Sequence, residues 1–160
     1  MARLAALGIT LHLSARAGGL TDEGRALTVE SAEGRQEIAT DKVLVTVGRA
    51  PVTRGFGLQD LGLTMNGEFL AIDDRCATSM RGVYAIGDVV GEPLLAHKAS
   101  AQGEMVAEII AGLEREFDKV AIPAIIFTEP EIVSVGLSPD EAAERGEQIV
   151  VGKFPLAASG

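Results

Sequence analysis

The residues best suited to chemistry are Gly87 and Asp88, which follow an apolar run at residues 83–86. The run predicts a buried strand, and a helix is expected to begin at about Leu94 to Ala96. A carboxylate at the carboxyl end of a strand, beside a helix N-terminus, is where open α/β sheets bind nucleotide cofactors, because free N–H groups point at the ligand there. The pattern predicts half of a cofactor site, although an Asp that caps a turn or a helix has the same local sequence.

Other reactive residue types are scarce. Cys76 is the only cysteine, so it forms no internal disulfide, and two histidines, His12 and His97, make no convincing metal cluster. We interpret Cys76 as a buried or loop thiol and His12 as a structural residue. We predict no catalytic residue and no metal ligand in this chain.

The composition excludes several classes of partner. Fourteen Lys and Arg residues stand against 23 Asp and Glu residues, and the net charge of −9 argues against nucleic acid or an anionic membrane surface. No apolar run reaches the length of a membrane helix, and the N-terminus lacks the order of a signal peptide. An apolar fraction of 47% favours a folded chain, which we expect to be soluble and cytoplasmic.

Residues 1–48 resemble in pattern the tail of a βαβ crossover followed by a hairpin. The predicted elements are a helical turn at 3–7 that Gly8 stops, a strand at 9–13, hairpin strands at 26–31 and 36–40, and a strand at 42–47. The last of these is nearly continuous in apolar residues, which is typical of a sheet covered on both faces.

Residues 49–77 are crowded with glycine and predict a loop-rich connection with one short strand at 69–73. The helix that follows the Asp88 motif is well marked, because Pro93 precedes it and Gly112 stands near its end. Small residues in its first half would let a backbone approach closely. The expected apolar stripe consists of Ala99, Val106, Ile110 and Leu113.

A third unit is expected to begin near residue 119, where the composition changes. Strands are predicted within 121–127 and at 132–136 and 148–154. Ser138, Pro139 and Glu141 form a strong helix start, with an N-cap hydroxyl, proline at the first position and a carboxylate three residues after the cap. Gly146 is expected to stop that helix.

Three motifs, in the same order, resemble those of the FAD- and pyridine-nucleotide-dependent disulfide oxidoreductases. Thr78 with the Val-Tyr-Ala-Ile-Gly-Asp of residues 83–88 resembles the second flavin-binding motif. Residues 43–51 resemble the exit from the NAD domain, and residues 127–136 resemble the start of the dimer-interface domain. Residues 94–99 look most like the dihydrolipoamide dehydrogenase branch, with mercuric reductase and glutathione-reductase-like enzymes as alternatives.

The resemblance implies contacts with two cofactors, FAD and NAD. The implied residues are Gly87, Asp88, Leu94, Leu95, Ala96 and His97 for FAD, and Gly48 and Ala17 for NAD. Asp88 would accept hydrogen bonds from the ribityl hydroxyls, and the backbone N–H groups of residues 94–97 would face the flavin ring. Gly48 would approach the nicotinamide cofactor closely, with Ala17 near its adenosine half. His97 has the chemistry of a general base, but the resemblance makes it a flavin neighbour instead.

The resemblance also implies a fold: partial Rossmann-like FAD and NAD domains of the α/β class, followed by the start of an α+β interface domain. The expected ranges are 1–48 for the NAD domain, 49–118 for the FAD-contacting segment and 119–160 for the interface domain. The family's first glycine fingerprint and its redox cysteine pair are absent. We therefore expect the middle of a longer homodimeric enzyme, with a 2-oxo acid dehydrogenase complex as partner and no activity in this chain alone. A non-catalytic nucleotide-binding or assembly module is the alternative.

Overall fold

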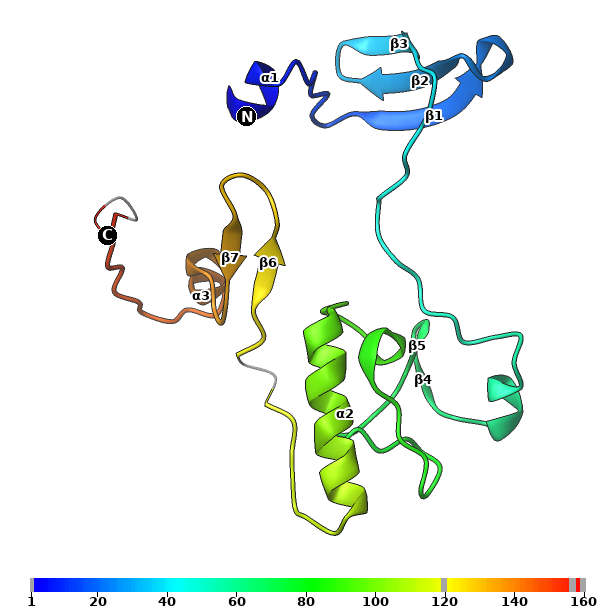
Figure 1. Cartoon of the computed structure of the whole chain (residues 1–160), viewed down its shortest axis with the longest axis vertical. Helices are drawn as coiled ribbons and strands as arrows, with labels where there is room; N and C mark the ends of the chain where they lie inside the picture. The colour runs from blue at the N-terminus through cyan, green and yellow to red at the C-terminus, as the bar shows by residue number, and fades with distance from the viewer. Residues whose placement is uncertain (1, 119–120, 156–157, 159–160) are drawn as a thin grey trace. The chain divides into compact units, whose positions relative to one another are not determined.

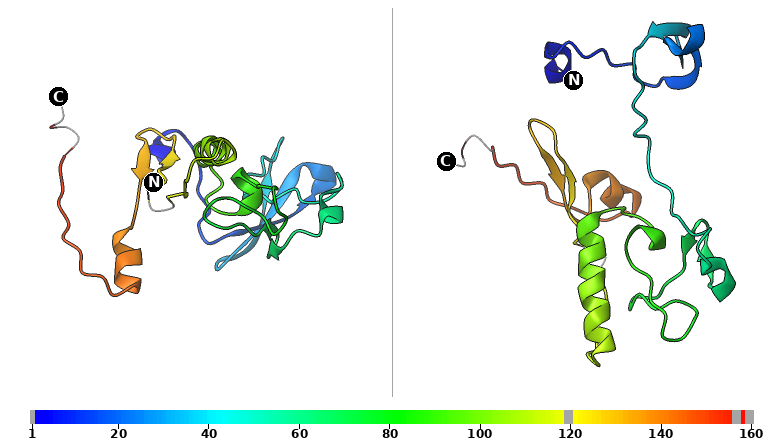
Figure 2. Two further views of the ribbon diagram at one scale, coloured as in Figure 1. Left: turned by 90° about the horizontal axis from the view of Figure 1, so that it is seen from below. Right: turned by 45° about the vertical axis from the view of Figure 1, so that its right-hand side comes forward.

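The computed structural model describes residues 2–118, 121–155 and 158. The chain divides into two compact units, Met1–Gly48 and Arg49–Gly160, which are described one at a time (Figures 1 and 2).

The first unit is built on a three-stranded antiparallel sheet in the order β1-β2-β3. A short helix, α1 (Ala2–Ala6), comes first, and β1 (Arg16–Thr21) leads through the turn η1 (Asp22–Gly24) to β2 (Ala26–Ser31) and β3 (Gly34–Ala39). The β2–β3 register leaves only residues 32 and 33 in the turn. The predicted hairpin is confirmed, with its second strand starting earlier than expected. Strand β1 was not predicted, because Gly18 and Gly19 weaken the strand pattern.

Four predictions of a strand are wrong. Residues 9–13, 42–47 and 148–154 have no strand structure, and residues 83–86 carry a single bridge, Ala77 to Tyr84. Val47 is 93% exposed and Val150 fully so. A strand needs a neighbour for its backbone N–H and C=O groups. In the described residues, none pairs with residues 9–13, 42–47 or 148–154, so their apolar side chains remain in solvent.

The second unit begins with short elements around a tight hairpin. The turn η2 (Leu58–Leu61) precedes β4 (Met65–Asn66) and β5 (Phe69–Leu70), which pair in antiparallel register. Gly67, at φ 62, occupies the first position of the two-residue turn, as such turns favour. The strand expected at 69–73 is therefore present but shorter.

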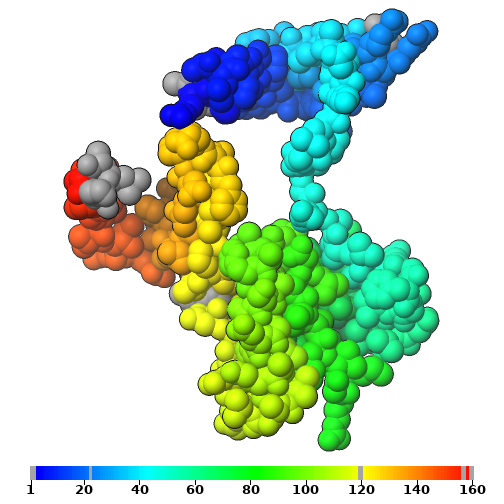
Figure 3. Space-filling view, viewed as in Figure 1, coloured from blue at the N-terminus to red at the C-terminus, as the bar shows by residue number. Residues whose placement is uncertain are grey.

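Helix α2 (Ala96–Ile110) carries the core of this unit, and its bounds agree with the prediction. Its buried face packs Met105, Val106 and Ile109 around Cys76, which is fully buried. Ile72, Tyr84 and Phe117 complete the cluster, and Figure 3 shows α2 and the segment before it as one close-packed green body.

The predicted apolar stripe of α2 is partly wrong. Val106 is buried, but Ile110 and Leu113 are 69% and 49% exposed. The buried face instead runs through two polar residues, Lys98 and Gln102, at the N-terminal half of the helix. A stripe drawn from hydrophobicity alone misses these positions, because polar side chains can be buried where they find partners.

The end of the chain holds a small hairpin and a capped helix. Strands β6 (Ala124–Ile126) and β7 (Ile132–Ser134) pair antiparallel, inside the regions predicted. Helix α3 (Pro139–Glu144) has the expected capping box, in which Ser138 Oγ accepts from Glu141 N at 3.2 Å and Ser138 N donates to Glu141 Oε2 at 2.9 Å. Gly146, at φ 69, follows its end.

Candidate functional site

The Asp88 carboxylate stands on a short turn, η3 (Gly87–Val90), rather than after a regular strand. The segment before it is held by residues 76–78: Ala85 N donates to Cys76 O at 3.0 Å, and Thr78 Oγ1 donates to Val83 O at 2.8 Å. Asp88 is exposed, and no hydrogen bond of its carboxylate to another described residue is found. The carboxylate is thus available to accept hydrogen bonds from a ligand.

The start of α2 offers backbone donors beside this turn (Figures 1 and 2). The N-cap residue Leu95 supplies no side-chain acceptor, and the N–H groups of Ala96 and His97 have no acceptor among the described residues. Leu94 N donates to Glu92 Oε2 at 3.0 Å, and Leu95 N donates to Pro93 O at 3.0 Å. Of the four residues expected to present N–H groups, Leu94 and Leu95 therefore already have partners in the protein.

The His97 side chain is exposed and bonded to the following segment. Its Nε2 lies 2.7 Å from Pro123 O. A carbonyl oxygen only accepts hydrogen bonds, so Nε2 carries the proton in this contact.

Two residues that sequence reasoning missed lie behind the turn. Lys98 and Gln102 are each 4% exposed. Gly87 N donates to Gln102 Oε1 at 2.8 Å, and Lys98 Nζ donates to Gly91 O. Their spacing of four residues on a helix was the available signal, since it puts them on one face.

The two residues expected near NAD lie in the first unit. Ala17 is on β1, paired with Val29 of β2. Gly48 has φ 136, a conformation that favours glycine, and no atom lies within 4 Å of where its Cβ would be. Apart from the chain neighbours of Gly48, none of the described residues fills this position, which leaves room for the close approach of a ligand.

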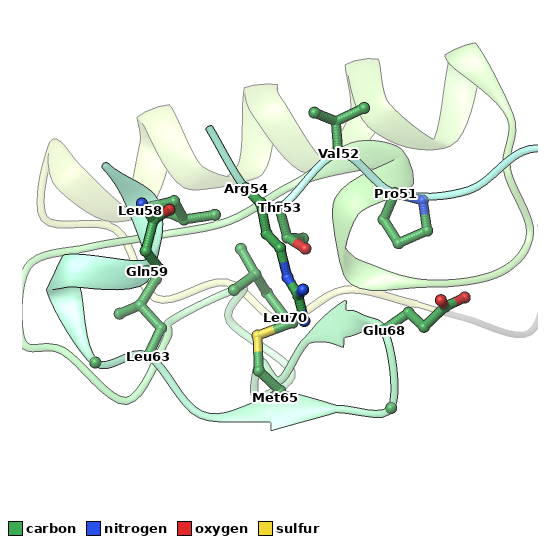
Figure 4. A pocket seen from close by; sticks show the side chains of 12 residues that line it. Pro51, Val52, Thr53, Arg54, Leu58, Gln59, Leu63, Met65, Glu68 and Leu70 are labelled. Atoms are coloured by element: carbon green, nitrogen blue, oxygen red, sulfur yellow. The ribbon is translucent and has the colours of Figure 1, made fainter. Parts of the chain in front are cut away.

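A pocket of about 700 Å³ was also not foreseen (Figure 4). Arg54 and Glu68 contribute charge to its lining, and Leu58, Leu63, Met65 and Leu70 contribute apolar surface. None of the predicted site residues lines it. The segment was predicted only as a loop, because turn geometry, rather than a recognisable pattern, shapes this pocket.

Two other kinds of feature are absent from the part of the chain that the structure describes. No group of three or more His, Cys, Asp or Glu side chains is arranged to hold a metal ion there. Among the described helices, none is long and apolar enough to cross a membrane.

Sequence comparison identifies relatives for almost the whole chain. Residues 1–103 match the family described as pyridine nucleotide-disulphide oxidoreductase, and residues 122–160 match its dimerisation domain. Proteins named dihydrolipoyl dehydrogenase from Pseudomonas aeruginosa and Bacillus subtilis are 53% and 41% identical, over 96% and 95% of this chain. The chain spans about a third of their length, 33% in both cases.

Structural comparison gives the same fold. The chain is similar to LpdA from Mycobacterium tuberculosis, with a TM-score of 0.74 and 30% identity over 91% of this chain and 32% of that one. A flavoprotein disulfide reductase, RclA from Escherichia coli, has a TM-score of 0.79 at 24% identity, covering 98% of this chain and 36% of that one. The expected fold class, partial Rossmann-like domains followed by the start of an α+β interface domain, is confirmed.

Proposed function

Because this chain belongs to the pyridine nucleotide-disulphide oxidoreductase family, we propose that it is the central segment of a flavoenzyme that oxidises dihydrolipoamide with NAD⁺. The observation that carries the proposal is the exposed Asp88 carboxylate on η3, beside the N–H groups of Ala96 and His97, which have no acceptor among the described residues. The relatives named dihydrolipoyl dehydrogenase support the choice of substrate.

The residues at this site fit FAD. The exposed Asp88 carboxylate can accept hydrogen bonds, which suits the ribityl hydroxyls, and the α2 N-terminus favours negative charge on a ring that lies against it. Bound FAD would supply the step that carries electrons from a dithiol to NAD⁺. The protein's part in this segment is to bind and orient the flavin. The single cysteine of the chain, Cys76, is buried in the core, so the reactive disulfide must come from another segment.

Each of the three predicted ranges has its own role in the proposed enzyme. Residues 1–48 belong to the NAD domain, with Gly48 and Ala17 near the cofactor; residues 49–118 contact FAD; and residues 119–160 begin the interface domain. The match of residues 122–160 to a dimerisation domain supports a homodimer. Association with a 2-oxo acid dehydrogenase complex follows from the proposed substrate. A single cysteine fits a cytoplasmic location, where thiols stay reduced.

A chimeric enzyme tests the proposal directly. The chain replaces the matching third of the Pseudomonas aeruginosa relative, with which it shares 53% identity over 154 residues. We expect a dimer that retains flavin absorbance and reduces NAD⁺ with dihydrolipoamide. The proposal is wrong if the chimera forms the dimer but purifies without flavin, or binds flavin but fails to use dihydrolipoamide.

The matched variant is Asp88→Ala in the same chimera. Loss of hydrogen bonds to a charged acceptor costs about 1.5–3 kcal/mol, which weakens FAD binding by about 10- to 150-fold. Flavin remaining after extensive dialysis measures the effect. Asp140→Ala, an exposed carboxylate on α3, is the control and should retain flavin as the unaltered chimera does. Unchanged flavin occupancy in Asp88→Ala would remove Asp88 from the site.

A further inference from the structure

Two polar side chains of α2, Lys98 and Gln102, are buried. Each is 4% exposed, in a face whose other half consists of apolar side chains. Burying an ammonium group is costly, and apolar residues of similar size often stabilise a core as well or better. The pair is therefore better explained by what it contacts than by the stability it contributes.

The contacts lie at the two ends of one turn. Gln102 Oε1 accepts a hydrogen bond from Gly87 N at 2.8 Å, where η3 begins. Lys98 Nζ donates to the carbonyl oxygen of Gly91, the residue that caps the end of η3. Asp88 stands between these two attachment points. The backbone that carries the exposed carboxylate is thus fixed at both ends to the same face of α2.

Packing holds the turn at a set distance from the helix. A Cβ on Gly87 would come within 3.2 Å of Ala99 Cβ, and one on Gly103 within 3.4 Å of Ile86 Cδ1. Gly87 and Gly91 have φ values of 77 and 115, which only glycine adopts readily. The close contacts and the two hydrogen bonds together fix the position of the turn η3 relative to α2.

The charges are consistent with the same arrangement. Burial lowers the pKa of the Lys98 ammonium, while the carboxylates of Asp88 and Glu92 and the Cys76 thiol act in the opposite direction. The ammonium itself donates to the backbone carbonyl oxygen of Gly91.

We propose that Lys98 and Gln102 are positioning residues that hold the turn from Gly87 to Gly91 so that the Asp88 carboxylate meets the ribityl hydroxyls of FAD. The inference rests on the proposed function and extends it to two buried residues behind the turn. If the inference is right, Lys98 and Gln102 affect FAD binding only through Asp88. A general contribution to folding would affect FAD binding without Asp88 as well.

The first experiment measures the turn without any cofactor. In the 160-residue chain, amide hydrogen exchange at Gly87 is compared between the wild type and Gln102→Met, which keeps the side-chain volume but removes the acceptor. We expect exchange at Gly87 to become at least about tenfold faster. Glu104→Gln, an exposed position on the same helix, is the control and should leave it unchanged. Unchanged exchange at Gly87 in Gln102→Met overturns the inference.

The second experiment is a double-mutant cycle in the flavin-loaded chimera. Gln102→Met and Lys98→Met should each weaken FAD binding by about tenfold. Combined with Asp88→Ala, neither should weaken it beyond Asp88→Ala alone, because the turn no longer carries the acting carboxylate. Additive losses would show a general structural role and overturn the inference. Gln102→Glu keeps an acceptor oxygen at this reach and should retain FAD.

The two failures are distinguishable. A correctly dimeric chimera without flavin contradicts the proposed function, whatever Gly87 exchange shows. A chimera that binds flavin normally, and keeps it in Gln102→Met and Lys98→Met, leaves the proposed function intact and overturns the positioning role.

Discussion

The α2–η3 region and the segment at residues 42–47 are both rich in small and apolar residues, yet they differ in burial. Met105, Val106 and Ile109 of α2 are buried, whereas Leu44 and Val47 are 86% and 93% exposed. The partners of α2 lie near it in the chain, from Ile72 before the helix to Phe117 after it. Residues 42–47 have no paired strand among the described residues. Apolar composition therefore makes a core only where the partner segments are present.

The largest expected effect tests whether α2 carries the core of its unit. Ile109→Ala removes a side chain that is 8% exposed, and such truncations cost about 2–5 kcal/mol of the free energy of unfolding. Ile110→Ala, the next residue along the helix, is 69% exposed and should change it by no more than about 0.5 kcal/mol. Urea unfolding followed by circular dichroism measures both. Equal losses would contradict the difference in burial between Ile109 and Ile110.

A smaller effect is expected at the contact between the turn and the helix. Gly87→Ala introduces a Cβ at 3.2 Å from Ala99 Cβ and places alanine at φ 77. We expect a loss of about 1–3 kcal/mol. Gly112→Ala also has a positive φ, 95, but meets no atom within 4 Å, and should cost only about 1 kcal/mol. A Gly87→Ala loss no larger than that of Gly112→Ala would show that η3 is not held closely against α2.

The capping box of α3 should respond to pH. Hydrogen bonds from the Ser138 hydroxyl and then from the Ser138 backbone N–H lower the pKa of Glu141. A carboxyl group with a lowered folded pKa stabilises the helix above its unfolded pKa, and this contribution is lost as the pH falls through the folded value. Nuclear magnetic resonance shifts of residues 139–144 should therefore show fraying at a pH below the ordinary range for Glu. Ser138→Ala should weaken this pH dependence without abolishing it, because the hydroxyl donor is lost and the backbone N–H donor remains.

The smallest change in stability is expected in the exposed segment. Val47→Asp alters a side chain in solvent, so the free energy of unfolding should stay within about 0.5 kcal/mol of the wild type. Self-association of the chain should decrease, because exposed apolar segments and unpaired backbone favour contacts between molecules. Analytical ultracentrifugation reports the second effect. A large loss of stability would show that residues 42–47 are packed in solution, and the contrast with α2 would fail.

Features that depend on local chemistry could be predicted from the sequence. The hairpin of β2 and β3, the bounds of α2 and the capping box of Ser138 and Glu141 all depend on residues close together in the chain. The lack of strand structure at 9–13, 42–47 and 148–154 could not be predicted, because an apolar or alternating run shows what a strand would bury and does not show whether a neighbouring strand is there. Lys98 and Gln102 were missed for a related reason, since their burial depends on the backbone of η3.

The buried Cys76 thiol can serve as a built-in probe of local unfolding. It is the only cysteine in the sequence, it is 0% exposed, and it lies against Met105, Val106 and Ile109. A thiol reagent can modify it only when that part of the protein opens, so the rate of labelling reports local unfolding at one site and needs no engineered probe. The same reaction, followed with and without flavin, would show how much ligand binding suppresses the opening of the segment around Asp88.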